Sequence, residues 1–293
     1  MPNFNLGGLA KEAAKMKFRS FNLTLPSGPQ RPPLFTLSGQ TVHQAQPARP
    51  VIGGHRAPFV PATPMSVPPA LFKAASNTKD DVDYQKSMHE LYNGLFDSLL
   101  DAIEFGLNSW RTSAGLVDVH INGPVATGGR LQGPAIDTLI ASSPAVAGWT
   151  NWSAKIRDAV AKGMQQQWST VASTITVPGL SWYPAFATVP SPQAPPMPNV
   201  PTPFSALKQD MSAMAPDAFK SIMRGLFQGN FEFSTQFFES LSTGLQQPLQ
   251  NWRSSQVVTG VLGSGSVPTF APPYVPVGPV VNGLIIPGPH FST

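Results

Sequence analysis

The stretch that decides the fold is MHELYNGLFDSLLDAIEFGLNSW, residues 88–110. Its apolar residues recur at intervals of three and four, which predicts one amphipathic helix from about Asp81 to Arg111. Acids near its start and Arg111 at its end suit the helix dipole. After Trp110 the pattern changes to the apolar alternation of residues 116–121, which is typical of a strand, and then to a Gly-Pro segment.

Two further regions follow the same plan, in which a helix ends near a tryptophan and a strand-like segment follows. The first spans about residues 150–171, and the second about residues 216–253 with a break predicted at Gly229-Asn230. The tryptophans in question are Trp110, Trp168 and Trp252. We expect each of them to close the apolar stripe of its helix against the β segment that follows.

Composition limits the classes of protein that fit this chain. It has 33 Pro and 25 Gly in 293 residues, 12% charged residues and no Cys. The missing Cys excludes disulfide scaffolds, thiolate metal sites and cysteine catalysis, and the prolines interrupt long regular elements. We therefore predict an α+β fold of amphipathic helices, each followed by short β or Gly-Pro segments. Long extended proline-rich arms would leave the chain mostly irregular.

Changes in composition along the chain predict five segments. They are a basic proline-rich arm (1–80), helical modules with short β segments (81–183), a linker with eight prolines (184–204), a long helical region (205–253) and an uncharged Gly/Pro-rich β tail (254–293).

The N-terminal arm carries most of the basic charge. Residues 1–79 hold nine Lys or Arg and one acid, Glu12. Within the arm, residues 4–18 predict a short basic amphipathic helix, which we interpret as a docking peptide. Its apolar stripe would comprise Leu6, Leu9, Ala13 and Met16. The arm could bind nucleic acid or an acidic protein surface, and we favour docking on the acidic face of a neighbouring copy.

No set of residues converges on a catalytic chemistry. The histidines are far apart and none has metal-ligand spacing. Asp97, Asp101 and Glu104 share one helix face, where carboxylates could serve as acid and base, but a solvated or interface face explains them better. We therefore expect no catalytic residue, no cofactor and no metal, and a protein that is not an enzyme.

Two groups of apolar residues predict contacts between subunits. Phe231, Phe233, Phe237 and Phe238 either form an internal core or pack against a helix of another subunit, and we favour the second. The tail 254–293 has no charged residue, so in water it would expose a long apolar strip. We expect residues 257–262 and 280–286 to add as strands to another subunit. The contact residues would be Val257, Val258, Val280, Val281, Ile285 and Ile286.

Repeated motifs connect these segments to a known class. Gly123-Pro-Val begins a twelve-residue segment that ends in Gly-Pro134, and Gly278-Pro-Val begins one that ends in Gly-Pro289, which we interpret as an internal duplication. With the basic proline-rich arm and the helices that end in Trp, these motifs make the whole chain resemble minor virion proteins of large tailed bacteriophages.

That resemblance implies a structural subunit of a virion, in the tail, baseplate, neck or capsid accessory layer. Its partners would be copies of itself, as a homo-oligomer, and other structural proteins of the same particle, assembled in the host cytoplasm. No stretch approaches the roughly 20 apolar residues of a membrane span, so no membrane partner is expected.

Two other classes stay open from the sequence. A nucleic-acid-associated protein would use the basic arm, and its binding would weaken steeply as salt is raised. A subunit of a cellular polymer or surface matrix would use the same interlocking arms, and it would be exported.

Overall fold

The fold is that of a computed structural model, which describes residues 6–21, 78–183, 193–229, 231, 233–267, 270–271, 275–276 and 280–292. It is mixed helix and sheet, which confirms the α+β class. The chain divides into two compact units, and we call the first of them, residues 1–22 with 93–293, the body. Of the second unit, residues 23–92, the structure describes residues 78–92, where the first long helix begins. The expected proline-rich arm from residue 22 to residue 77 lies outside the described residues.

The helices agree closely with the sequence periodicity. They are α1 (Leu6–Arg19), α5 (Thr78–Ser113), α6 (Ile136–Ala141), α7 (Asn151–Thr174), α8 (Pro216–Leu226) and α9 (Ser234–Ser255), with 3-10 turns at Phe204–Ala206 and Ser212–Met214. The break predicted at Gly229-Asn230 is confirmed, because α8 ends before it and α9 begins after it.

The strands form one large antiparallel sheet and two small ones. The large sheet has the order β3-β2-β1-β10-β7-β4, and the small sheets have the orders β11-β6-β5 and β8-β9. Their bounds are β1 (Gly115–Asn122), β2 (Val125–Gln132), β3 (Val177–Ser181), β4 (Gln193–Pro198), β5 (Thr202–Pro203), β6 (Val257–Val258), β7 (Leu262–Ser266), β8 (Phe270–Ala271), β9 (Val275–Pro276), β10 (Val281–Ile285) and β11 (Phe291–Ser292).

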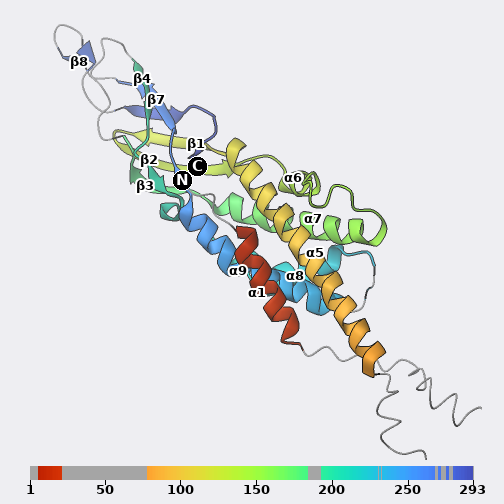
Figure 1. Ribbon diagram of the computed structural model, residues 1–293. Helices are drawn as coiled ribbons and strands as arrows, with labels where there is room; N and C mark the ends of the chain where they lie inside the picture. Colours follow the sequence, from red (N-terminus) through yellow and green to blue (C-terminus); the bar gives the residue numbers. More distant parts are fainter. Residues whose placement is uncertain are drawn as a thin grey trace, which may run out of the picture. The chain divides into compact units, whose positions relative to one another are not determined.

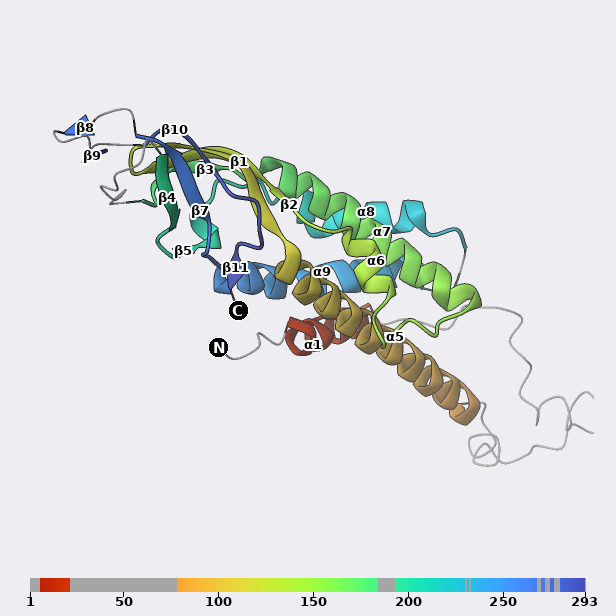
Figure 2. The same ribbon diagram turned by 90° about the horizontal axis from the view of Figure 1, so that it is seen from above.

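Three tryptophans meet where the helices reach the sheet. The large sheet lies at one end of α5, α7 and α9 (Figures 1 and 2). Trp110, Trp168 and Trp252, near the ends of these helices, are at most 4% exposed, as their spacing predicts. The ring of Trp168 packs edge-on against the other two, with centroid distances of 5.0 Å to Trp110 and 5.8 Å to Trp252. The sequence did not predict this mutual contact, which joins the three helices directly.

The C-terminal tail completes the large sheet of its own chain. β10 lies between β1 and β7, with Ile121 opposite Gly283 and Ser264 opposite Leu284. β7 and β10 approach closely, since a Cβ on Gly265 would lie 2.5 Å from the Cα of Gly283. The prediction that the tail adds its strands to another subunit is therefore wrong in this structure. The backbone of residues 281–285 is thus paired within its own chain, although Val281 and Leu284 keep 38% and 52% of their surface exposed.

The end of the tail is fastened by His290. Its side chain is buried, and its Nδ1 accepts a hydrogen bond of 2.8 Å from the backbone N–H of Leu116. Its backbone N–H donates to the carbonyl of Ala114. Burial lowers the pKa of His290, which keeps the ring neutral so that Nδ1 can accept. The tail is thus tied to the segment that links α5 to β1.

Part of the expected linker also belongs to the body. Residues 184–192 lie outside the described residues, but residues 193–198 form β4 at the edge of the large sheet, paired with β7. Pro195 and Pro196 fit there because an edge strand has a neighbour on one side, so a missing N–H can face outward. A proline-rich composition therefore marks an edge strand here rather than a spacer.

The tryptophan contact gives a prediction about stability. Trp168→Ala should lower the free energy of unfolding by roughly 3–5 kcal/mol, the usual cost of deleting a large buried aromatic side chain. Trp152 on the same helix is 43% exposed, so Trp152→Ala should cost much less and serves as the control. Urea unfolding followed by circular dichroism measures both. Equal effects of the two substitutions would show that the cluster does not hold the helices together.

Candidate functional site: the groove that holds the N-terminal helix

Half of the ten side chains predicted to contact other subunits are buried inside the body. Phe237 and Phe238 are fully buried, and Phe231 packs against both of them, with ring centroids 5.7 and 6.1 Å away. Phe231 also lies against Phe227 and Trp152, and Phe233 is half-buried at the start of α9. The interpretation of these phenylalanines as a contact between subunits is therefore corrected for Phe237 and Phe238. Side chains of the same chain fill the space around them.

The predicted contact residues of the tail are divided between interior and surface. Val258, Val280 and Ile285 are buried and Val257 is half-buried. Val281 and Ile286 are 38% and 40% exposed. The structure thus brings none of the predicted contact residues together into one open interface. A different surface, around helix α1, brings the N-terminal residues together with α5 and α9.

Helix α1 packs into a groove between α9 and the second half of α5 (Figures 1 and 2), and we call this the α1 groove. The buried stripe of α1 consists of Ala10, Ala14 and Phe18, each at most 1% exposed. The first part of the predicted extended arm is therefore a docked helix of the body.

Close contact with α9 depends on small residues. A Cβ on Gly244 would lie 2.7 Å from both the Cβ and the backbone nitrogen of Ala14. A glycine is thus required where the two helices touch. At the end of the stripe, Phe18 packs edge-on against Phe96 of α5 at a centroid distance of 5.6 Å, and Phe96 stacks on Phe237 of α9 at 4.7 Å. One aromatic column therefore joins α1, α5 and α9.

The lysines of α1 pair with carboxylates along the groove. The Nζ of Lys11 lies 2.5 Å from Oδ1 of Asp101, and the Nζ of Lys15 lies 2.6 Å from Oδ1 of Asp97. Both pairs are four residues apart on their own helix, and their order is opposite, so α1 runs antiparallel to this part of α5. Partly exposed ion pairs contribute at most about 1 kcal/mol each. We therefore infer that they set the direction and register of α1 in the groove, and that apolar packing supplies most of the binding energy.

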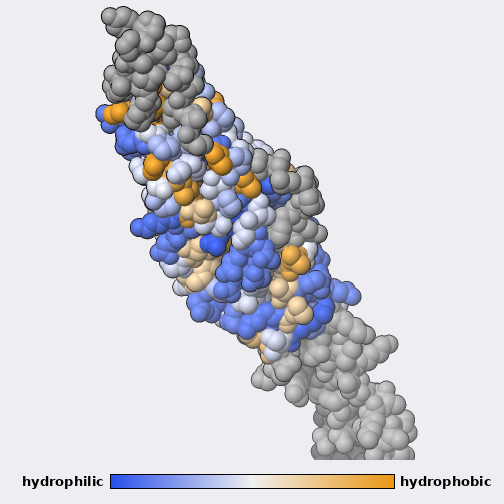
Figure 3. All heavy atoms as spheres, turned by 90° about the vertical axis from the view of Figure 1, so that its left-hand side faces the viewer, coloured by the Kyte–Doolittle hydropathy of each residue, from blue (hydrophilic) through white to orange (hydrophobic). Residues whose placement is uncertain are grey.

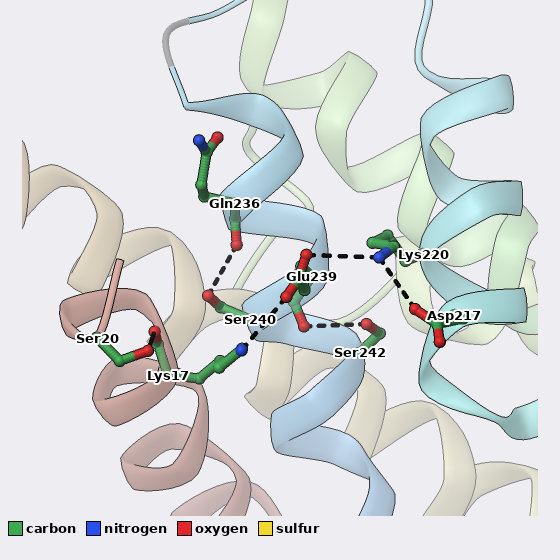
Figure 4. Close-up of polar contacts among 8 residues, drawn as sticks. All are labelled: Lys17, Ser20, Asp217, Lys220, Gln236, Glu239, Ser240 and Ser242. Atoms are coloured by element: carbon green, nitrogen blue, oxygen red, sulfur yellow. Dashed lines mark hydrogen bonds and ion pairs between the residues drawn. The ribbon is translucent and has the colours of Figure 1, made fainter. Parts of the chain in front are cut away.

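A third lysine joins a network that reaches α8. Glu239 of α9 accepts from Lys17 of α1 at 3.3 Å and from Lys220 of α8 at 3.4 Å (Figure 4). Lys220 also pairs with Asp217 at 3.0 Å. The hydrogen bond that Lys220 donates to Asp217, with the charge of Glu239, raises the pKa of Lys220 and keeps it protonated. The carboxylate of Glu239 thus connects α1 to α8 through two ion pairs.

The sequence predicted this helix but not the face that it buries. The expected stripe contained Leu9 and Met16, which are 54% and 62% exposed in the structure, and Ala13, which is half-buried. Of Leu6, the fourth member of that stripe, the structure describes the backbone alone. Ala10 and Ala14 are buried in place of the larger Leu9 and Met16, because small side chains let α1 approach α9 closely. In this position Lys11 and Lys15 reach the carboxylates of α5. The matching four-residue spacings of Lys11 and Lys15 and of Asp97 and Asp101 were the available signal.

The acidic face of α5 thus has an assigned role at the groove. Asp97 and Asp101 are ion-paired, and Glu104 lines a surface depression of about 530 Å³ beyond Asp101, with Phe105 and Asn108. Among the residues that the structure describes, no group of three or more acidic or histidine side chains could hold a metal ion. None of the helices in the described ranges combines the length and hydropathy of a membrane span.

Comparison of the chain with protein-family models, with curated proteins and with solved structures finds no match.

The close contact at Gly244 gives a test of the docking. Gly244→Ala should loosen α1, since the added methyl group would overlap Ala14 and overpacking of this kind costs roughly 1–3 kcal/mol. Trypsin should then cleave faster after Lys11, Lys15 and Lys17. Gly225→Ala on α8 is the matched control, because a Cβ there meets nothing within 4 Å. Cleavage at the same rate in both variants would contradict the tight contact between α1 and α9.

Proposed function

We propose that this chain is a structural subunit of a large multiprotein particle, and that it acts without catalysis. We place it in the virion of a tailed bacteriophage, in the tail, baseplate, neck or capsid accessory layer. Its partners would be copies of itself and other structural proteins of that particle. The observation that carries the proposal is the docked helix α1 at the end of a long proline-rich connection.

The connection is far longer than docking inside one chain requires. Antiparallel neighbouring helices are commonly joined by two to eight residues. Between Phe21 and Thr78 the chain has 56 residues, eleven of them proline. A segment of this length can span up to about 190 Å when fully extended. Connections of such length are typical of functional loops or of linker segments, and we interpret this one as the reach of an interlocking arm.

The large sheet supports assembly by arms rather than by sheet extension. Its outer strands are β3 and β4, and both contain proline: Pro178 in β3 and Pro195, Pro196 and Pro198 in β4. Proline cannot donate to a neighbouring strand, and it protects sheet edges against further pairing. Contacts between copies through the arm are therefore favoured over extension of this sheet.

The charges of the arm also favour a protein partner. Three of its nine basic residues, Lys11, Lys15 and Lys17, are paired with carboxylates of the body. They are therefore engaged by an acidic protein surface of the kind that the sequence predicts for the arm. This pairing favours docking on protein over binding to nucleic acid, which would compete with Asp97, Asp101 and Glu239 for the same charges.

Apolar side chains at the surface offer further contacts for neighbours. Figure 3 shows one face of the molecule, where hydrophobic residues reach the surface between hydrophilic ones. On α1, Leu9 and Met16 are more than half exposed. On the large sheet, Leu262, Leu284 and Ile286 are 37%, 52% and 40% exposed. We propose these exposed side chains as further contact points for neighbouring subunits.

The experiment is to measure the mass and copy number of the chain in extracts of the cells that produce it. Wild-type chain should sediment in a high-mass particle with several copies. The double variant K11E/K15E should be released as folded single chains, because each reversed charge faces Asp101 or Asp97. K155E/K162E on α7 changes the charge equally at exposed positions away from the groove and should sediment like wild type.

The outcomes separate the classes of function. Wild-type chain that migrates singly in fresh extracts at its natural abundance would refute the structural role. Release of the chain by nuclease would identify a nucleic-acid-associated protein. Electron microscopy of the high-mass fraction distinguishes a virion from a cellular polymer.

A further inference from the structure

We propose that the α1 groove receives helix α1 from a second copy of this chain, so that copies are linked by exchanged N-terminal helices. The inference rests on the proposed structural role and adds the partner and the contact surface. The contacts that carry it are the stripe Ala10, Ala14 and Phe18, the opposing Gly244 and the ion pairs along α5.

The contacts of α1 are complete in themselves. Small residues fit against Gly244, Phe18 packs on Phe96, and three lysines meet three carboxylates. All of these groups lie on α1, on the second half of α5 or on α9. An identical helix from another copy would make the same contacts in the same antiparallel direction. The groove therefore cannot distinguish its own helix from that of a neighbour by contact energy.

What distinguishes them is local concentration. A linker raises the local concentration of a tethered helix to about the millimolar range when it is short, and this advantage falls with roughly the 3/2 power of linker length. A connection of 56 residues therefore loses about ten-fold relative to one of about ten residues. Copies held side by side in a particle present their helices at comparable concentrations. Exchange between neighbours thus becomes competitive there, as in domain swapping.

Exchange would also link assembly to the body of each copy. An arriving α1 adds Phe18 to the aromatic column of Phe96 and Phe237 and adds Lys17 to Glu239. A copy that has given its helix away without receiving one would expose that column. A copy with an empty groove is thus disfavoured, so each helix that is given away has to be replaced by one that is received, in a closed or continuous set of exchanges.

The test uses the absence of Cys from the natural chain, since the introduced thiols are then the only ones. One full-length chain carries Lys15→Cys and the other carries Asp97→Cys, and the two are co-expressed so that they assemble together. The Lys11–Asp101 pair stays intact in both. A short bis-maleimide joins the two thiols, and mass spectrometry of the digest identifies peptides linked between positions 15 and 97.

Exchange predicts a cross-linked heterodimer with the 15–97 linkage in the particle fraction. Co-expression of Lys162→Cys with Asp97→Cys is the control for random collision, because Lys162 lies exposed on α7 and forms no ion pair in the described part of the chain. A chain that carries both Lys15→Cys and Asp97→Cys reports docking within one copy.

The following results would overturn the proposal. If the mixed chains give no more heterodimer than the Lys162 control while the double variant cross-links internally, α1 stays in its own groove. If the double variant fails to cross-link at all, the groove itself is misplaced. Internal cross-links in a particle of many copies would refute exchange and leave the structural role standing, whereas a chain that migrates singly would refute the structural role.

Discussion

The packing of Trp110, Trp168 and Trp252 is the contact on which the other parts of the body depend. Each ring ends the apolar stripe of a long helix and is buried at the junction with the sheet. Edge-on aromatic pairs contribute about 0.5–1.5 kcal/mol beyond the area they bury. The indole N–H groups of Trp168 and Trp252 are buried without a hydrogen-bond partner among the described residues, which opposes that gain. The cluster is therefore stabilised by close packing and by the apolar area that it buries. Phe291 of β11 also packs on Trp110, with the ring centroids 6.0 Å apart.

The helices that meet at the tryptophans lead into two sheets: β1 and β3 of the large sheet follow α5 and α7, and β6 of a small sheet follows α9. β2 and β10 run in the same direction, because each is antiparallel to β1. They carry the middle of each Gly-Pro repeat, and their antiparallel partners β1 and β7 come after helices that have Trp-Arg in their last turn. The internal duplication that the repeated motifs indicate stays a prediction. The tail supplies β7 and β10 of the large sheet, and the two outer strands, β3 and β4, contain proline.

The sequence predicted the elements whose causes are local. Periodicity placed α5, α7 and α9 within a few residues, and Gly229-Asn230 marked the break between α8 and α9. Hydropathy indicates that Phe237 and Val280 are buried against other apolar side chains. It does not indicate whether those side chains belong to the same chain or to another subunit. For the candidate site, the sequence predicted a basic docking helix and an acidic face. It missed the buried face of α1, because Ala10, Ala14 and Gly244 matter through their small size and not through hydropathy.

The described strands of the tail pair within their own chain, which favours the N-terminal arm as the element that joins copies. Amide hydrogen exchange of the full-length chain, diluted until it is monomeric, measures this pairing. Amides of β10 should be protected in the monomer to the same degree as those of β1, because β10 pairs with β1 and β7 of its own chain. Fast exchange across residues 281–285 in the monomer, with protection gained when copies associate, would contradict this pairing and return the tail to a strand shared between subunits.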